Sequence, residues 1–187
     1  MKGEVRIIGG CWRGRQLIFE ARPGLRPTPG RARETLFNWL GQQLPGWRCL
    51  DLYAGSGALG FEAASRGAEF VTLVEQDSRA FRALVANARR FQALNLDIQS
   101  GKALDWLKRT QHTYDLIFLD PPYDSGELAL IWPWLASRLN PSGWVYCESA
   151  QGMTAGLPWH EVRYTKVGQA RLQLFQLRAE SGAGNED

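Results

Sequence analysis

The chain has 187 residues, 44% of them hydrophobic and 22% charged, and it carries a net charge of +3. These values predict one globular domain, while three cysteines without a close-spaced pair argue against a disulfide framework and, with only two histidines, against a metal site. The amino terminus lacks the apolar core of a signal peptide and no apolar run reaches the length of a membrane span, so we expect a cytoplasmic protein with no membrane association.

The first 33 residues are strongly basic. They hold eight lysines and arginines against two glutamates, a net charge of +6, which leaves −3 for the rest of the chain. Such asymmetry is typical of a polyanion-binding arm on a neutral-to-acidic body, although a solvated basic face is the alternative. The arginines that we expect to contact nucleic-acid phosphates are Arg13, Arg15, Arg26, Arg31 and Arg33.

The predicted elements begin with a hairpin and a helix. Val5–Ile8 and Gln16–Phe19 have the pattern of two strands joined by a glycine-containing turn. Thr28-Pro29 predicts a helix start, with the hydroxyl as the cap and the proline at the first helical position, and the apolar face continues through Leu44 until Pro45. We therefore expect residues 1–45 to form a basic nucleic-acid-binding extension.

Short apolar runs alternate with helical patterns in the rest of the chain. Such alternation implies right-handed crossovers and a doubly wound, mostly parallel α/β sheet. The expected elements, in chain order, are Cys49–Leu52, Ala58–Arg66, Phe70–Val74, Ser78–Phe91, Asp97–Gln99, Leu104–Lys108, Leu116–Leu119, Leu128–Leu139 and Trp144–Cys147.

The pattern changes after Pro158, where Glu161–Lys166 and Arg171–Leu177 predict a closing antiparallel hairpin. An antiparallel end on a parallel sheet is common in large mixed sheets. We expect residues 46–178 to form a seven-stranded Rossmann-like core and residues 179–187 to form a disordered tail.

A glycine-rich loop follows the first strand of this core. Gly55, Gly57 and Gly60 have the dinucleotide spacing, and Glu75 ends the next strand, where it can accept both hydroxyls of a ribose. The spacing alone does not separate a nicotinamide enzyme from a methyltransferase or from a structural turn. A carboxylate at Asp51 would repel a pyrophosphate but suits the ammonium and sulfonium of S-adenosylmethionine, so we favour a methyltransferase.

A second motif, Asp120-Pro-Pro-Tyr123, follows a later strand. The exocyclic amine of a nucleobase is a poor nucleophile because its lone pair is delocalised into the ring. Asp120 and the Pro121 carbonyl can accept hydrogen bonds from that amine and free the lone pair, while two prolines hold the carbonyl direction. Tyr123 offers a face on which an extruded base can stack. A strand-ending turn without function is the alternative for the motif alone.

Together the two motifs resemble class I methyltransferases of the Asp/Asn-Pro-Pro-Tyr/Phe type. More narrowly, the chain resembles the bacterial RsmD family, which methylates the exocyclic N2 of one guanine in small-subunit (16S) ribosomal RNA. The resemblance runs from about Arg6 to Leu177, and its family-specific stretches are Arg6–Arg15, Leu25–Thr28 and Arg31–Trp39.

The resemblance implies a Rossmann-like methyltransferase sheet, S-adenosyl-L-methionine as the cofactor and small-subunit ribosomal RNA as the partner. It implies a catalytic loop of Asp120, Pro121, Pro122 and Tyr123. The expected cofactor-binding residues are Asp51, Tyr53, Ala54, Gly55, Gly57, Glu75, Gln76, Lys102 and Ala103. Many relatives of the fold carry Asp or Asn near Lys102 to bind the adenine amine, so here we expect backbone groups near Ala103 to bind adenine.

Two alternatives remain open at this point. The Asp-Pro-Pro-Tyr motif also suits adenine N6 in DNA or RNA, although the amino-terminal stretches favour guanine N2. A non-catalytic RNA-binding assembly factor could keep the fold, but the intact Asp120 and glycine loop argue against it. We expect a monomer, and the substrate is either naked RNA or an assembling or assembled small subunit.

Overall fold

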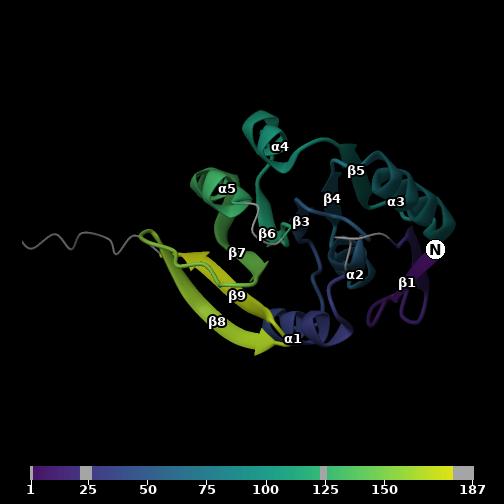
Figure 1. Cartoon of the computed structure of the whole chain (residues 1–187), viewed down its shortest axis with the longest axis horizontal. Helices are drawn as coiled ribbons and strands as arrows, with labels where there is room; N and C mark the ends of the chain where they lie inside the picture. Colours follow the sequence, from purple (N-terminus) through teal and green to yellow (C-terminus); the bar gives the residue numbers. More distant parts are fainter. Residues whose placement is uncertain (1, 22–26, 123–125, 179–187) are drawn as a thin grey trace, which may run out of the picture.

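The computed structural model describes residues 2–21, 27–122 and 126–178; the predicted tail lies outside them. Two sheets are present in this part of the chain (Figure 1). The first is a hairpin of β1 (Lys2–Arg6) and β2 (Gln16–Glu20). The second has seven strands: β3 (Arg48–Asp51), β4 (Phe70–Glu75), β5 (Leu96–Ser100), β6 (Tyr114–Leu119), β7 (Leu139–Ser149), β8 (Trp159–Val167) and β9 (Ala170–Leu177).

The large sheet has the order β5-β4-β3-β6-β7-β9-β8, and its first five strands are parallel. The predicted doubly wound α/β sheet is therefore confirmed. Strand β9 pairs antiparallel with both β7 and β8, so the closing hairpin inserts its second strand next to the parallel part. The chain leaves β3 toward β4 and later crosses to β6, which makes the carboxyl ends of β3 and β6 the switch point where ligands bind in such sheets.

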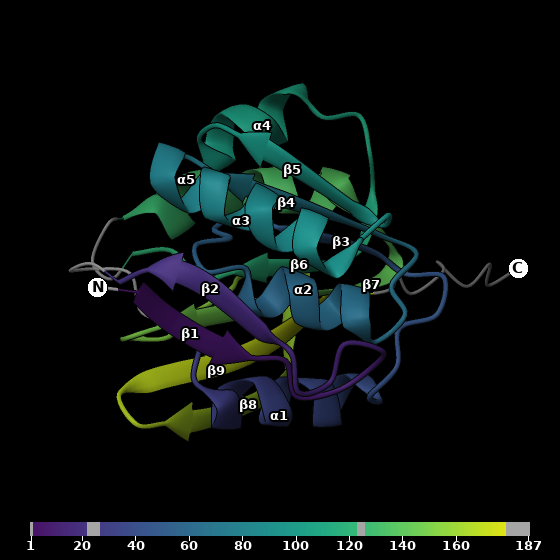
Figure 2. The same cartoon turned by 90° about the vertical axis from the view of Figure 1, so that its right-hand side faces the viewer.

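Helices cover both faces of this sheet. They are α1 (Gly30–Leu40), α2 (Ala58–Ser65), α3 (Ser78–Phe91), α4 (Ala103–Arg109) and α5 (Glu127–Leu135), which runs into a 3₁₀ turn at Ala136–Arg138. Figure 2 shows α2 and α3 in front of the sheet, with α1 beside β8 and β9. None of the described helices has the length and apolarity to cross a membrane.

Alternation along the strands divides the core between the two faces. Leu116 and Phe118 of β6 pack in one buried cluster with residues of α1, α2 and α3, whereas Ile117 and Leu119 pack in a second cluster with α4 and α5. Successive side chains of a strand point to opposite faces, and a strand buried on both faces is apolar throughout. The continuous apolar runs in the sequence reflect this double covering.

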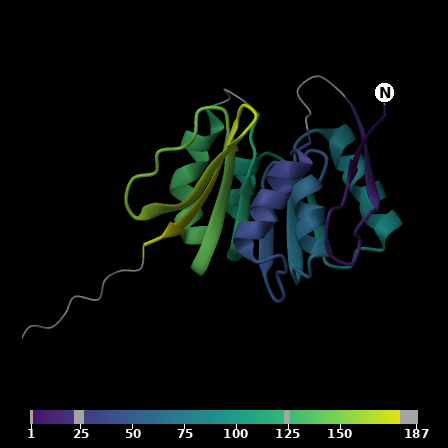
Figure 3. The ribbon, with the colours of Figure 1, turned by 90° about the horizontal axis from the view of Figure 1, so that it is seen from below.

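The amino-terminal hairpin packs against α2 and α3, on the opposite side of the molecule from β8 and β9 (Figure 3). Asn87 of α3 bonds both the amide and the carbonyl of Ile18, at 3.1 and 2.9 Å. In the turn between β1 and β2, Gly10 has φ of +76°, and a Cβ there would lie 1.8 Å from the Ser65 carbonyl oxygen. Glycine at this position lets the turn lie directly on the end of α2.

The first helix is shorter than the sequence predicts. It begins at Gly30 after Pro29 and ends at Leu40, because Gly41 takes the left-handed conformation with φ of 95° and donates to the Phe37 carbonyl. The expected extension to Leu44 is wrong, although that side chain is fully buried beyond the helix. Thr28 does not cap the helix, because Pro29 holds the N-cap position and no described side chain accepts a hydrogen bond from the first-turn amides.

Candidate active site

A pocket of about 1130 Å³ opens at the predicted switch point. It is lined by the carboxyl ends of β3, β4, β6 and β7, by the segment before α1 and by the turn between β8 and β9. Of the residues predicted to bind cofactor or catalyse, the pocket brings together Asp51, Tyr53, Ala54, Gly55, Glu75, Gln76, Ala103, Asp120, Pro121 and Pro122. Tyr123 lies outside the described residues.

The pocket is acidic. Among the described residues that line it, none is lysine or arginine, and six carry carboxylates: Asp51, Glu75, Asp77, Asp120, Glu127 and Glu148. A ligand that presents cationic groups or hydrogen-bond donors suits such a wall, whereas a pyrophosphate does not.

Asp51 ends β3 and is 1% exposed. Its Oδ2 accepts the Gly60 amide at 3.1 Å, while no donor within the described ranges pairs with the buried Oδ1. Burial raises the pKa of Asp51 to about 7. The unpaired oxygen keeps the capacity to accept a hydrogen bond from a cationic ligand.

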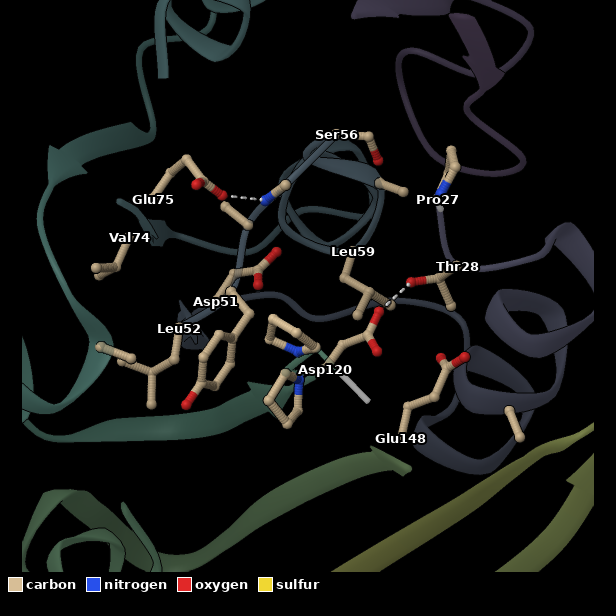
Figure 4. A pocket seen from close by; sticks show the side chains of 18 of the residues that line it. Pro27, Thr28, Asp51, Leu52, Ser56, Leu59, Val74, Glu75, Asp120 and Glu148 are labelled. Carbon is tan, nitrogen blue, oxygen red and sulfur yellow. Dashed lines mark hydrogen bonds between the residues drawn. The ribbon is translucent and has the colours of Figure 1, made fainter. Parts of the chain in front are cut away.

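Glu75 ends β4 and binds the glycine loop. Its Oε2 accepts the Gly55 amide at 2.8 Å and its Oε1 accepts the Asp77 amide at 2.7 Å (Figure 4). Each carboxylate oxygen can accept a further hydrogen bond. The side chain is therefore held in place and keeps acceptor capacity toward the pocket.

Two predicted cofactor residues are not in the pocket lining. Gly57 precedes α2 with φ of 80°, and a Cβ there would meet Leu84 and Phe61 at 2.7 and 2.8 Å. Its glycine is thus required for packing α2 against α3 rather than for an approach to the pocket. Lys102 is exposed at the start of α4, while its neighbours Gly101 and Ala103 line the pocket.

Asp120 follows β6 and lines the pocket between Thr28 and Glu148 (Figure 4). The Thr28 hydroxyl donates to Asp120 Oδ2 at 3.2 Å, so the segment before α1 contacts the predicted catalytic loop. Burial raises the pKa of Asp120 well above its usual range, and the Glu148 and Asp51 carboxylates add to this effect.

Glu148 is a pocket residue that the sequence did not reveal. It lies near the end of β7, the strand beside β6, and is only 3% exposed. Tyr146 donates its hydroxyl to Glu148 Oε2 at 3.1 Å, and burial raises the pKa of this glutamate. The only sequence signal was a carboxylate at a strand end on the same edge as Asp120.

The predicted RNA-contacting arginines occupy different parts of the molecule. Arg31 is exposed in the first turn of α1, next to the pocket wall at Pro29. Arg13 and Arg15 are exposed in the hairpin turn, which lies at the carboxyl end of α2, about 12 Å along the helix from the pocket. Arg26 lies outside the described residues.

The prediction that Arg33 contacts RNA is wrong in this structure. The side chain is 2% exposed, and its Nη1 lies 3.0 Å from Oε2 of the fully buried Glu62. It also donates to the Thr28 carbonyl from Nε, at 3.3 Å. Arg33 therefore joins α1 to α2 and has no surface to offer a phosphate.

The chain is similar to known methyltransferases over nearly its full length. The family profile described as "Conserved hypothetical protein 95" matches residues 5–176. The protein named ribosomal RNA small subunit methyltransferase D from Escherichia coli (strain K12) is 39% identical, over 95% of this chain and 92% of that protein. The protein of the same name from Haemophilus influenzae is 38% identical, over 94% of this chain and 95% of the relative.

A solved structure agrees with these matches. The structure titled "Putative methyltransferase yhhF from Escherichia coli" has a TM-score of 0.85 and 39% sequence identity, and the alignment covers 95% of this chain and 100% of that one. The sheet and its neighbours thus define the Rossmann-like methyltransferase fold class. Within that class, the chain belongs to the RsmD family, the family of ribosomal RNA small subunit methyltransferase D.

Proposed function

We propose that this protein transfers a methyl group from S-adenosylmethionine to the exocyclic N2 amine of a guanine in small-subunit ribosomal RNA. The observation that carries the proposal is the placement of Asp120, with its Pro-Pro sequence, in the wall of a pocket lined by carboxylates and by no described basic residue. The names of the relatives support ribosomal RNA as the substrate.

The residues of the inner pocket fit this cofactor. The unpaired Asp51 Oδ1 can accept the ammonium of its methionine part, and the free lone pairs of Glu75 can accept the ribose hydroxyls. Gly101 and Ala103 also line the pocket, and their backbone groups would bind adenine. When bound, S-adenosylmethionine supplies an electrophilic methyl group on a sulfonium centre.

The outer pocket fits the amine. Asp120 and the Pro121 carbonyl accept hydrogen bonds from the two N2 hydrogens, which draws the nitrogen toward tetrahedral geometry. The freed N2 lone pair would attack the methyl group that bound S-adenosylmethionine would supply, with the sulfur keeping the electron pair of the C–S bond. The Asp120 carboxylate, whose pKa is raised by burial, takes the proton that N2 loses.

The proposed activity can be tested with small-subunit RNA and with small subunits from cells that lack the gene. The purified protein and S-adenosylmethionine should produce N2-methylguanosine at one position, located by mass mapping of nuclease fragments. Formation of N6-methyladenosine instead, or of no methylated nucleoside on either substrate, would contradict the proposal. Calorimetry should show binding of S-adenosylmethionine and none of NAD.

Cofactor affinity should depend on pH through Asp51. Because its pKa is raised to about 7, the carboxylate is mostly protonated below that pH, and only the ionised form pairs with an ammonium. Affinity for S-adenosylmethionine should therefore rise about tenfold from pH 5.5 to pH 7, below the range of about 7.7–8.0 in which an α-amino group loses its proton. Calorimetry at several pH values measures this, and Asp51→Asn should bind more weakly with a flat profile.

The exposed arginines should contribute to RNA affinity by binding phosphates. Removing one arginine–phosphate interaction should flatten the logarithmic salt dependence by about 0.7–0.9. We expect Arg31→Ala to flatten the salt dependence because Arg31 adjoins the pocket. Arg13→Ala should flatten it as well if RNA extends along α2 to the hairpin turn, and the double variant Arg13→Ala with Arg31→Ala combines both changes. RNA binding over a salt series measures both, with unchanged S-adenosylmethionine affinity as the control. A slope unaltered in the double variant would mean that RNA docks elsewhere.

A further inference from the structure

Two carboxylates lie side by side in the pocket wall next to Thr28, although amine activation uses only one. Asp120 follows β6 and Glu148 lies near the end of β7, and these neighbouring parallel strands end at the same edge of the sheet. Figure 4 shows the Glu148 carboxylate on the same side of the pocket as Asp120 and Thr28. Glu148 is a buried acid, with an exposure of 3%. The described residues of the pocket lining include no basic side chain that could neutralise it.

The Glu148 carboxylate is held in place through only one of its two oxygens. Its Oε2 accepts the hydroxyl of Tyr146, a fully buried side chain of the same strand, at 3.1 Å. Within the described residues no hydrogen bond reaches Oε1. Burying a carboxylate costs free energy unless a partner satisfies it. Because Glu148 lines the pocket, its free oxygen can accept a hydrogen bond from a ligand bound there.

A guanine presents such a donor beside its amine. On the Watson–Crick edge of guanine, N1 carries a hydrogen next to the N2 amine, whereas N1 of adenine or of 2,6-diaminopurine is an acceptor. We propose that Glu148 determines base specificity by accepting the N1–H of the target guanine while Asp120 and the Pro121 carbonyl hold its N2 amine. The inference rests on the proposed function and adds the group that selects guanine.

The positions of the two carboxylates suggest which group of the base each one binds. Asp120 adjoins the Pro121 carbonyl, and Thr28 already engages its Oδ2, so it suits the amine that reacts. Glu148 lies on β7, the strand beside β6, and Tyr146 of the same strand fixes it, so it suits the neighbouring ring nitrogen. A base whose N1 is an acceptor would place a lone pair against the carboxylate and leave both groups unpaired, which is how a buried polar group rejects a wrong substrate.

Exchange of the carboxylate for an amide tests this assignment. Glu148→Gln keeps the shape and an acceptor but adds an N–H that can donate to an unprotonated N1. The probes are small-subunit RNA with its natural target guanine and the same RNA with 2,6-diaminopurine at that position. Wild type should prefer guanine in kcat/KM by about 10- to 100-fold, and the variant should lose or reverse this preference. Differences at position 6 of the base are common to both enzymes and cancel in the comparison.

Asp120→Asn is the matched control, because it should lower turnover on both RNAs without changing their ratio. Glu148→Gln should keep wild-type affinity for S-adenosylmethionine, which also shows that it is folded. An equal fall on both RNAs in that variant would overturn the assignment. So would a wild-type enzyme that methylates both bases equally, whatever the variant does. If wild type methylates no guanine at all, the proposed function fails instead.

Discussion

Replacing Asp120 by alanine should lower the turnover of RNA methylation about 100- to 1,000-fold, the range for removing one preorganised polar group. The variant loses the acceptor for the amine and the base that takes its proton. Affinity for S-adenosylmethionine should change little, because the expected cofactor contacts come from β3 and β4. Single-turnover assays with saturating RNA measure the chemical step, and calorimetry measures the cofactor.

Asp120→Asn separates the two roles of this side chain. An amide oxygen still accepts a hydrogen bond from the amine and from Thr28, so the loss should be smaller than with alanine. Wild-type turnover in the alanine variant would remove Asp120 from the chemistry. A cofactor affinity that falls in parallel with turnover would show a structural role instead.

Much of the core could be predicted because its signals are local. Apolar strands between amphipathic helices, glycines after β3 and a turn between β8 and β9 each lie within a few residues of sequence. The insertion of β9 between β7 and β8 could not be predicted in this way, because the pairing of distant strands has no local signal. Helix α1 ends early because Gly41 takes the left-handed conformation. The apolar pattern alone predicted a longer helix, because it continues to the buried Leu44.

The site residues also differ in whether a local sequence signal reveals them. Asp51 and Asp120 each sit in a recognisable motif, and the structure brings both to one pocket. Glu148 has no motif, and its importance depends on the fact that β7 lies beside β6. Arg33 resembles the exposed arginines around it, and only its contact with Glu62, 29 positions away, separates it from them.

That contact is part of a buried network around Glu62 of α2. Besides Arg33, Glu62 accepts the Arg66 guanidinium at 2.9 Å and the backbone amides of Ile8 and Gly9 at 2.9 and 2.7 Å. One fully buried carboxylate thus connects the amino-terminal hairpin and α1 to the helix that follows the glycine loop. Arg33 extends the network through the Thr28 carbonyl to the residue whose hydroxyl holds Asp120.

Glu62→Ala should therefore lower the free energy of unfolding by about 3–5 kcal/mol, the range for removing one partner of a buried ion pair. Two guanidinium groups would lose their counter-charge, and two backbone amides would lose their acceptor. Urea unfolding followed by circular dichroism measures the change, with Glu69→Ala, an exposed acid before β4, expected within about 0.5 kcal/mol of wild type.

The unpaired cations left behind account for much of the expected loss. Adding Arg33→Met to Glu62→Ala should therefore cost less than the sum of the two single changes, because the double variant buries one unpaired guanidinium, that of Arg66, instead of two. Strict additivity of the two changes, or a loss below about 1 kcal/mol for Glu62→Ala alone, would contradict a stabilising role for this pair. In that case the hairpin and α1 are held to α2 mainly by their apolar contacts, through Ile7, Leu17 and Leu36.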